Sequence, residues 1–221
     1  MKVISKFNYF RKSYLVFTPL PYRILMHMAA PAALILLGAW LYTLLGLSGM
    51  VFLVTLFYLY LEISLDTFLF GGIAAKEVGI SEYLKSSHRG LQMMGNALAV
   101  SAVKPLLMLL LMNSAAGVMG GFRKGAALSA EDVLMALMLI FAAVFLIVAG
   151  MAAVRFFESR MLGFFVSVAA GILFTGIYFA AAQNWEWLLP VSFLLMTAAM
   201  VSSTGFILKR MKESYYDKGN E

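Results

Sequence analysis

The sequence predicts an all-α fold built from membrane-spanning helices, on two observations. Of the 221 residues, 62% are hydrophobic and only 13% are charged, whereas a soluble domain has about 45–50% apolar and about 25% charged residues. The apolar residues are gathered in runs of roughly 20, the length that a helix needs to cross about 30 Å of hydrocarbon. None of these runs alternates with a period of two, as the strands of a membrane barrel do. We therefore expect a polytopic helical bundle.

Six apolar runs predict six transmembrane helices in a membrane domain that covers residues 24–208. The expected spans are Ile24–Leu45, Met50–Phe70, Met93–Met112, Asp132–Val154, Met161–Ala182 and Glu186–Leu208. The connection at 47–49 is so short that the first two spans should form an antiparallel hairpin. The glycine-rich stretch 113–131 predicts a long external loop, at whose end Ser129 caps the fourth span together with Asp132.

The basic residues predict the orientation in the cell membrane, because lysine and arginine are disfavoured in short translocated loops. Fourteen of the seventeen fall on one side of the six-span map. Only Arg123 and Lys124 lie on the other side, and Lys104 lies within a span. Both termini, at 1–23 and 209–221, are therefore expected in the cytoplasm. The net charge of +6 then indicates orientation and contact with anionic lipids, and its spread over several loops does not suit nucleic-acid binding.

Residues 1–23 predict an amphipathic helix that lies on the cytoplasmic membrane surface and turns into the first span. Its apolar positions recur at helical spacing and are Val3, Phe7, Phe10, Tyr14 and Phe17. Proline cannot continue a helix, so Thr18–Pro21 should break it and form an elbow. The alternative is a basic tail that only anchors the orientation.

Prolines and small residues within the spans predict where helices bend and where they pack closely. Pro31 and Pro105 each free a backbone carbonyl that lipid cannot satisfy, so both should kink toward protein neighbours. Ser167, Gly171 and Thr175 recur every four residues along one face of the fifth span. Such a stripe is typical of close contact between membrane helices.

The cytoplasmic loop 71–92 between spans two and three predicts a short helix. Ser81 is suited to cap its start, and Gly90 is suited to end it in the left-handed conformation. Its side chains form a surface on which a soluble partner could dock, with Tyr83 and Leu84 apolar and Glu82, Lys85, His88 and Arg89 polar or charged. The alternative is a solvated connector that lies on the lipid headgroups.

Three ionisable residues fall inside expected spans, where each costs at least about 2.5–3.5 kcal/mol on insertion scales unless it meets a partner. Glu62 and Asp66 are four residues apart and share one face of span two. Lys104 enters span three from the same side to a similar depth, so we expect it to meet Glu62. One interpretation is a structural ion pair between the two spans. The other is a polar lining of a translocation path or a proton-sensitive site.

Several kinds of chemistry are disfavoured by the residue content. The chain has no cysteine and only two histidines, His27 and His88, so neither thiolate chemistry nor a metal site is expected. The segment 117–126 has glycines and a lysine at the wrong spacing for a phosphate-binding loop, so the chain is not expected to hydrolyse ATP. For an intramembrane enzyme, Glu62, Asp66 and His27 would be the only acid–base set.

Six spans, cytoplasmic termini, an amphipathic elbow at 3–17 and a short helix at 81–89 together resemble the permease subunit of an ABC-2-type ATP-binding-cassette exporter. The resemblance is topological and covers nearly the whole chain. It implies that Ser81–Arg89 is the coupling helix that docks on a separate ATPase subunit. ATP and magnesium would then act through that partner, with no cofactor in this chain, and a second permease copy or paralogue would complete the transporter. A peptide, a lipid or another amphipathic molecule would be the exported cargo.

One other transporter class fits the size and the number of spans. The substrate-binding membrane subunit of an energy-coupling-factor importer also has about six spans, and it uses small residues of the first span for contact. Ala29 and Ala33 would supply that contact here. Such a subunit needs no dedicated helix in its cytoplasmic loops, so the segment 81–89 favours the exporter.

Overall fold

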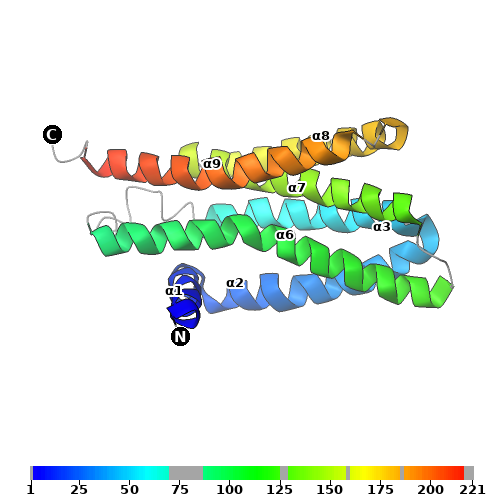
Figure 1. The fold of residues 1–221 in the computed structure, drawn as a ribbon, viewed down its shortest axis with the longest axis horizontal. Coiled ribbons are helices and arrows are strands. Elements are labelled where there is room, and N and C mark those ends of the chain that lie inside the picture. Colours follow the sequence, from blue (N-terminus) through cyan, green and yellow to red (C-terminus); the bar gives the residue numbers. More distant parts are fainter. Residues whose placement is uncertain (1, 70–86, 125–128, 158–159, 185–186, 217–221) are drawn as a thin grey trace.

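The computed structural model describes residues 2–69, 87–124, 129–157, 160–184 and 187–216, and every regular element in these ranges is a helix. The elements are α1 (Lys2–Phe17), α2 (Leu20–Ile24), the π-helical turn η1 (Leu25–Ala29), α3 (Ala30–Leu69), α6 (His88–Lys124), α7 (Ala130–Phe157), α8 (Arg160–Asn184) and α9 (Leu188–Tyr216). Figure 1 shows the long helices side by side along one axis. The predicted all-α class is confirmed.

Five helical stretches of the described chain are long and apolar enough to cross a membrane. They are Leu20–Thr67, His88–Gly121, Ala130–Val154, Met161–Gln183 and Leu188–Lys209. The first is 48 residues long and reverses direction at Gly46, whose φ of 77° is readily adopted only by glycine. A Cβ atom built on Gly38 would touch Val54, so the two halves of this stretch are antiparallel, as the hairpin prediction requires.

α6 lies against both halves of that hairpin and fixes their register. A Cβ atom at Gly38 would lie 2.8 Å from the Cβ of Ala116, and one at Gly120 would lie 2.6 Å from that of Tyr42. Both numbers rise together along these helices, so residues 30–45 run parallel to α6. The second half of α3 runs antiparallel to α6, because Thr55 meets Asn113 and Glu62 meets Lys104.

The predicted external loop 113–131 is wrong for residues 113–124, because α6 continues to Lys124. Ala116 and Gly120 are buried against the hairpin, so the small residues of this stretch serve close packing rather than a turn. The predicted cap at the far end of the connection is present. The amide of Asp132 donates to Oγ of Ser129 at 3.1 Å, and that hydroxyl donates to the Asp132 carboxylate at 2.7 Å.

α8 packs on the second half of α3 through the predicted stripe of small residues. Oγ of Ser64 donates to Oγ of Ser167 at 3.4 Å, and Gly171 faces Leu56. The stripe therefore serves helix packing. α9 packs on α7 and stays helical to Tyr216, so residues 209–216 of the expected tail continue the last membrane-length helix.

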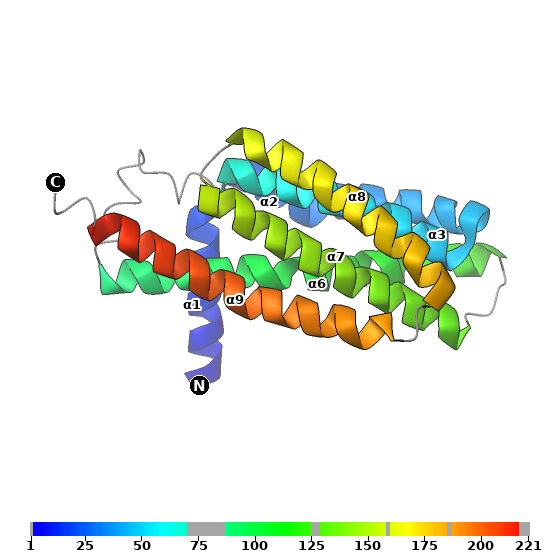
Figure 2. The same cartoon turned by 90° about the horizontal axis from the view of Figure 1, so that it is seen from above.

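α1 lies across the bundle instead of along it, as Figure 2 shows. Tyr14 is buried in a cluster with Met94, Leu98 and Ile207, which belong to α6 and α9. The predicted break is present, because α1 ends at Phe17 and α2 begins at Leu20. Shortly before Pro31, where a kink was predicted, the helix widens into the π-helical turn η1, and such a turn can relieve the clash between a proline ring and the preceding turn.

Candidate functional site

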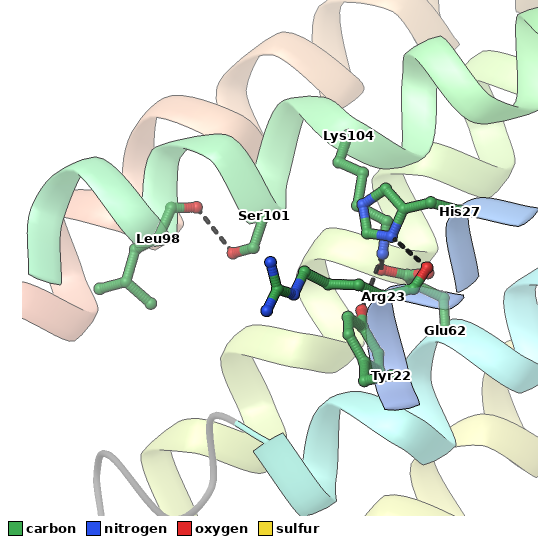
Figure 3. A network of polar contacts seen from close by, with 7 residues as sticks. All are labelled: Tyr22, Arg23, His27, Glu62, Leu98, Ser101 and Lys104. Carbon is green, nitrogen blue, oxygen red and sulfur yellow. Dashed lines mark hydrogen bonds and ion pairs between the residues drawn. The ribbon is translucent and has the colours of Figure 1, made fainter. Parts of the chain in front are cut away.

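A buried ion pair joins three helical segments at the centre of the candidate site. Nζ of Lys104 on α6 donates to Oε1 of Glu62 on α3 at 2.7 Å and to Oη of Tyr22 on α2, also at 2.7 Å. The side chains of Lys104 and Glu62 are only 6% and 1% exposed. Figure 3 shows the three groups converging between the helices. The contact between Glu62 and Lys104 that their matched depths predict is therefore present.

Local helix geometry explains why these side chains converge. Glu62 lies on the face of α3 that also carries Tyr58 and Asp66, one turn to each side, and all three are fully buried. Lys104 directly precedes Pro105. Tyr22 lies on the short helix α2, which follows the break after α1 and leads into the first span.

His27 extends the site from the π-helical turn. Its Nδ1 lies 3.1 Å from the carbonyl oxygen of Arg23. A carbonyl can only accept, so Nδ1 carries a proton and Nε2 is the acceptor of the neutral ring. The imidazole also lies edge-on to the rings of Tyr14 and Tyr22, with centroid distances of 6.1 and 6.2 Å. Figure 3 shows it beside Lys104 and Glu62, while the Arg23 side chain extends away from Glu62.

The apolar surroundings of Glu62 and Lys104 make their ion pair a strong link between helices. Leu59 and Ile63, on the same helix as Glu62, have no exposed surface. Charges in such surroundings are tolerated only when they are paired and hydrogen-bonded, because each has lost its hydration. Any movement of α2, α3 or α6 away from the others would separate Glu62, Lys104 or Tyr22 from its partner. The cluster therefore couples the positions of three segments.

The cluster offers a carboxylate, an ammonium group, a phenol and an imidazole, which are groups that bind and transfer protons. No group of three or more metal-ligating side chains occurs among the described residues. Of the three residues that could act as acids or bases in an intramembrane enzyme, Glu62 and His27 lie in one cluster (Figure 3). Asp66 is buried one turn further along α3.

The residues expected to dock an ATPase are divided by the limits of the described chain. Ser81, Glu82, Tyr83, Leu84 and Lys85 lie outside the described residues. His88 and Arg89 form the exposed start of α6. The prediction that Gly90 ends a short helix is wrong, because Gly90 lies in the first turn of α6 and its amide donates to Oγ of Ser87 at 2.9 Å. Ser87 is thus the residue that caps α6.

Two parts of the site were missed by the sequence analysis. Tyr22 was assigned to the elbow region. Its hydroxyl accepts a hydrogen bond from Lys104, but a neutral tyrosine does not show up in the spacing of charged residues. Asn113 was assigned to the external loop, yet it is buried and its Nδ2 donates to Oγ1 of Thr55 at 3.2 Å. A polar amide and a hydroxyl inside apolar stretches were the available signal for this second link between α3 and α6.

The importer contact residues Ala29 and Ala33 both lie on the exposed surface of the first helical stretch. Comparison of the chain with protein-family models, with curated proteins and with solved structures found no match.

Proposed function

We propose that the protein is the membrane-spanning permease subunit of an ATP-binding-cassette transporter. It exports a peptide, a lipid or another amphipathic molecule, with energy from a separate ATPase subunit that binds on the cytoplasmic side. A second permease subunit completes the pathway. This chain supplies the membrane pathway, and the partner binds ATP and magnesium.

The observation that supports this proposal best is the way α1 and α6 are joined. α1 crosses the bundle and packs on α6 through Tyr14 and Leu98 (Figure 2). α6 begins at His88, directly after the segment 70–87 that is expected to carry the docking helix. The transverse helix α1 thus packs on the same membrane helix, α6, into which the expected docking segment leads.

The polar contacts between α3 and α6 give a physical route for the energy. The segment 70–87 connects the end of α3 to the start of α6, and the two helices are linked by the pair Glu62–Lys104 and by Asn113–Thr55. Because these contacts hold the helices at two levels, a push on the connecting segment moves both helices as one body. Tyr22 passes the same displacement to α2.

The orientation is tested by labelling single cysteines, since the chain has none of its own. Ser86→Cys is expected to react with a membrane-impermeant maleimide only after the cells are opened. Ala130→Cys, at the exposed start of α7, is expected to react in intact cells. Labelling of Ser86→Cys from outside would reverse the topology and exclude a cytoplasmic docking segment.

Docking is tested by replacing Tyr83 and Leu84 together with serine. Apolar anchors dominate such interfaces, so loss of both is expected to abolish co-purification of the ATPase and the stimulation of its ATP hydrolysis. Membrane insertion should be unchanged, because neither residue belongs to an expected span. The matched control is Val16→Ser with Leu20→Ser, two exposed apolar residues of the expected cytoplasmic segment 1–23, which likewise lie outside the expected spans.

The control pair is expected to retain the ATPase and its full stimulation. If the Tyr83/Leu84 variant also retains both, the segment 70–87 is only a connector. If the wild-type protein captures no ATPase from its own cells, the permease function itself is rejected.

A further inference from the structure

An apolar groove runs along α6 next to its crossing with α1. It has a volume of ≈ 440 Å³, and its wall is formed by Ala99, Val103, Leu107 and Met108 of α6, with Phe10 of α1 at one end. Leu107 is 62% exposed and Phe10 is 40% exposed. The groove is therefore open to the surroundings of the bundle.

The size and the lining of the groove limit what can occupy it. Ten residues of a helix 10–12 Å wide fill roughly 1,200–1,700 Å³, several times the volume of the groove, so a helix of another chain could lie against its rim but not within it. Its wall is almost wholly apolar, which disfavours a polar solute. A single flexible hydrocarbon chain satisfies both limits.

The basic residues next to the groove indicate the charge of the headgroup that such a hydrocarbon chain carries. Arg11 and Lys12 follow Phe10 directly on α1, and both are exposed. Since α1 lies across the bundle (Figure 2), a chain that follows α6 past Val103 and Leu107 has its polar end near α1. Two exposed bases at that level attract an anionic headgroup.

We propose that the groove between α1 and α6 binds one anionic phospholipid, with an acyl chain along Val103 and Leu107 and its phosphate near Arg11 and Lys12. This site does not depend on the transport function proposed above. It is joined to the buried cluster by Lys104, whose side chain lines the groove while its Nζ bonds Glu62 and Tyr22. A bound acyl chain covers the apolar stem of Lys104 and keeps water from the ion pair.

The proposal is tested on the full chain, purified in detergent and stripped of lipid. Phosphatidylglycerol and phosphatidylcholine with identical acyl chains are added separately, and native mass spectrometry counts the molecules retained by each protein. One phosphatidylglycerol per chain is expected to persist and to raise the thermal unfolding temperature. Phosphatidylcholine should bind more weakly.

Two variants separate the acyl chain from the headgroup. Leu107→Trp fills the groove and is expected to weaken phosphatidylglycerol binding about tenfold, whereas Leu36→Trp, at a residue 65% exposed on α3, should leave it unchanged. Arg11→Gln with Lys12→Gln removes two bases that contribute about fivefold each near an anionic surface, or roughly 25-fold together. Lys209→Gln, at an exposed base of α9, is the control for charge.

Three outcomes would overturn the site. Equal retention of the two lipids would reject recognition of the headgroup. Unchanged binding by Leu107→Trp would place the lipid elsewhere on the bundle. A change in oligomeric state with Leu107→Trp, at unchanged lipid binding, would make this face a contact between two copies of the chain.

Discussion

Lys104→Met is expected to lower the free energy of unfolding by about 3–5 kcal/mol, the usual effect of removing one partner from a buried ion pair. The substitution leaves the Glu62 carboxylate 1% exposed and without the ammonium group that lies 2.7 Å away. Methionine preserves the length of the side chain, so little of the loss arises from packing. Detergent-solubilised protein is unfolded by heat and by SDS to measure it.

Glu62→Gln should cause a loss of similar size, because it leaves the buried Lys104 ammonium group with the neutral hydroxyl of Tyr22 in place of a carboxylate partner. The double variant removes both buried charges and should therefore recover part of the summed loss. We expect a coupling energy of about 2 kcal/mol or more between the two positions. The double-mutant cycle isolates this contact from other effects of either substitution.

An exposed ion pair of the same chemistry provides the control. Lys209 lies 3.7 Å from Glu213 on α9, and their side chains are 76% and 54% exposed. Because water screens such a pair, Lys209→Met should change stability by less than about 1 kcal/mol. Strictly additive losses at Glu62 and Lys104 would show that the two side chains do not interact in the folded protein.

Gly163→Ala should destabilise the protein by about 1–3 kcal/mol, the range for an overpacked contact. A Cβ atom at this position of α8 would collide with the side chain of Thr67 on α3. Thr67 is buried, and its hydroxyl donates to the carbonyl of Ile63 at 3.1 Å, so displacing its side chain breaks this hydrogen bond. The unfolding measurements described for Lys104 apply here as well.

Gly176→Ala, on the same helix, is the matched control. Nothing lies within 4 Å of a Cβ atom built there, and alanine favours a helix over glycine by about 0.8–1 kcal/mol. Stability should therefore be unchanged or higher. Equal effects of the two substitutions would mean that α8 does not approach α3 as closely as the structure has it.

The helical class and most of the membrane-length helices could be predicted, because the length of an apolar run directly indicates whether a helix can cross the membrane. The boundaries failed where small residues occur. Gly117, Gly120 and Gly121 were assigned to a loop, since glycine is common in turns, yet α6 continues through all of them. In a bundle, glycine also permits two backbones to approach, and a single sequence does not distinguish these two uses.

The candidate site was predicted in part for a related reason. Burial of a charge in an apolar run demands a partner, so the contact of Glu62 with Lys104 followed from depth alone. Tyr22 and His27 join the same cluster, but a tyrosine and a histidine near the end of a span are equally suited to the membrane interface. Neither residue needs a buried partner, so nothing in the sequence predicted that they join the buried cluster.

The sequence by itself determined that the chain forms membrane-length helices, that it breaks at Thr18–Pro21 and that its buried acid and base must meet, because solvation and proline geometry act locally. Only the tertiary structure decided that α1 crosses the bundle, that α6 lies against both halves of the hairpin and that a groove opens between α1 and α6. Those features depend on which helix faces contact one another. Many helix faces of this chain are equally hydrophobic. Close packing between particular small and large side chains selects which of them contact one another.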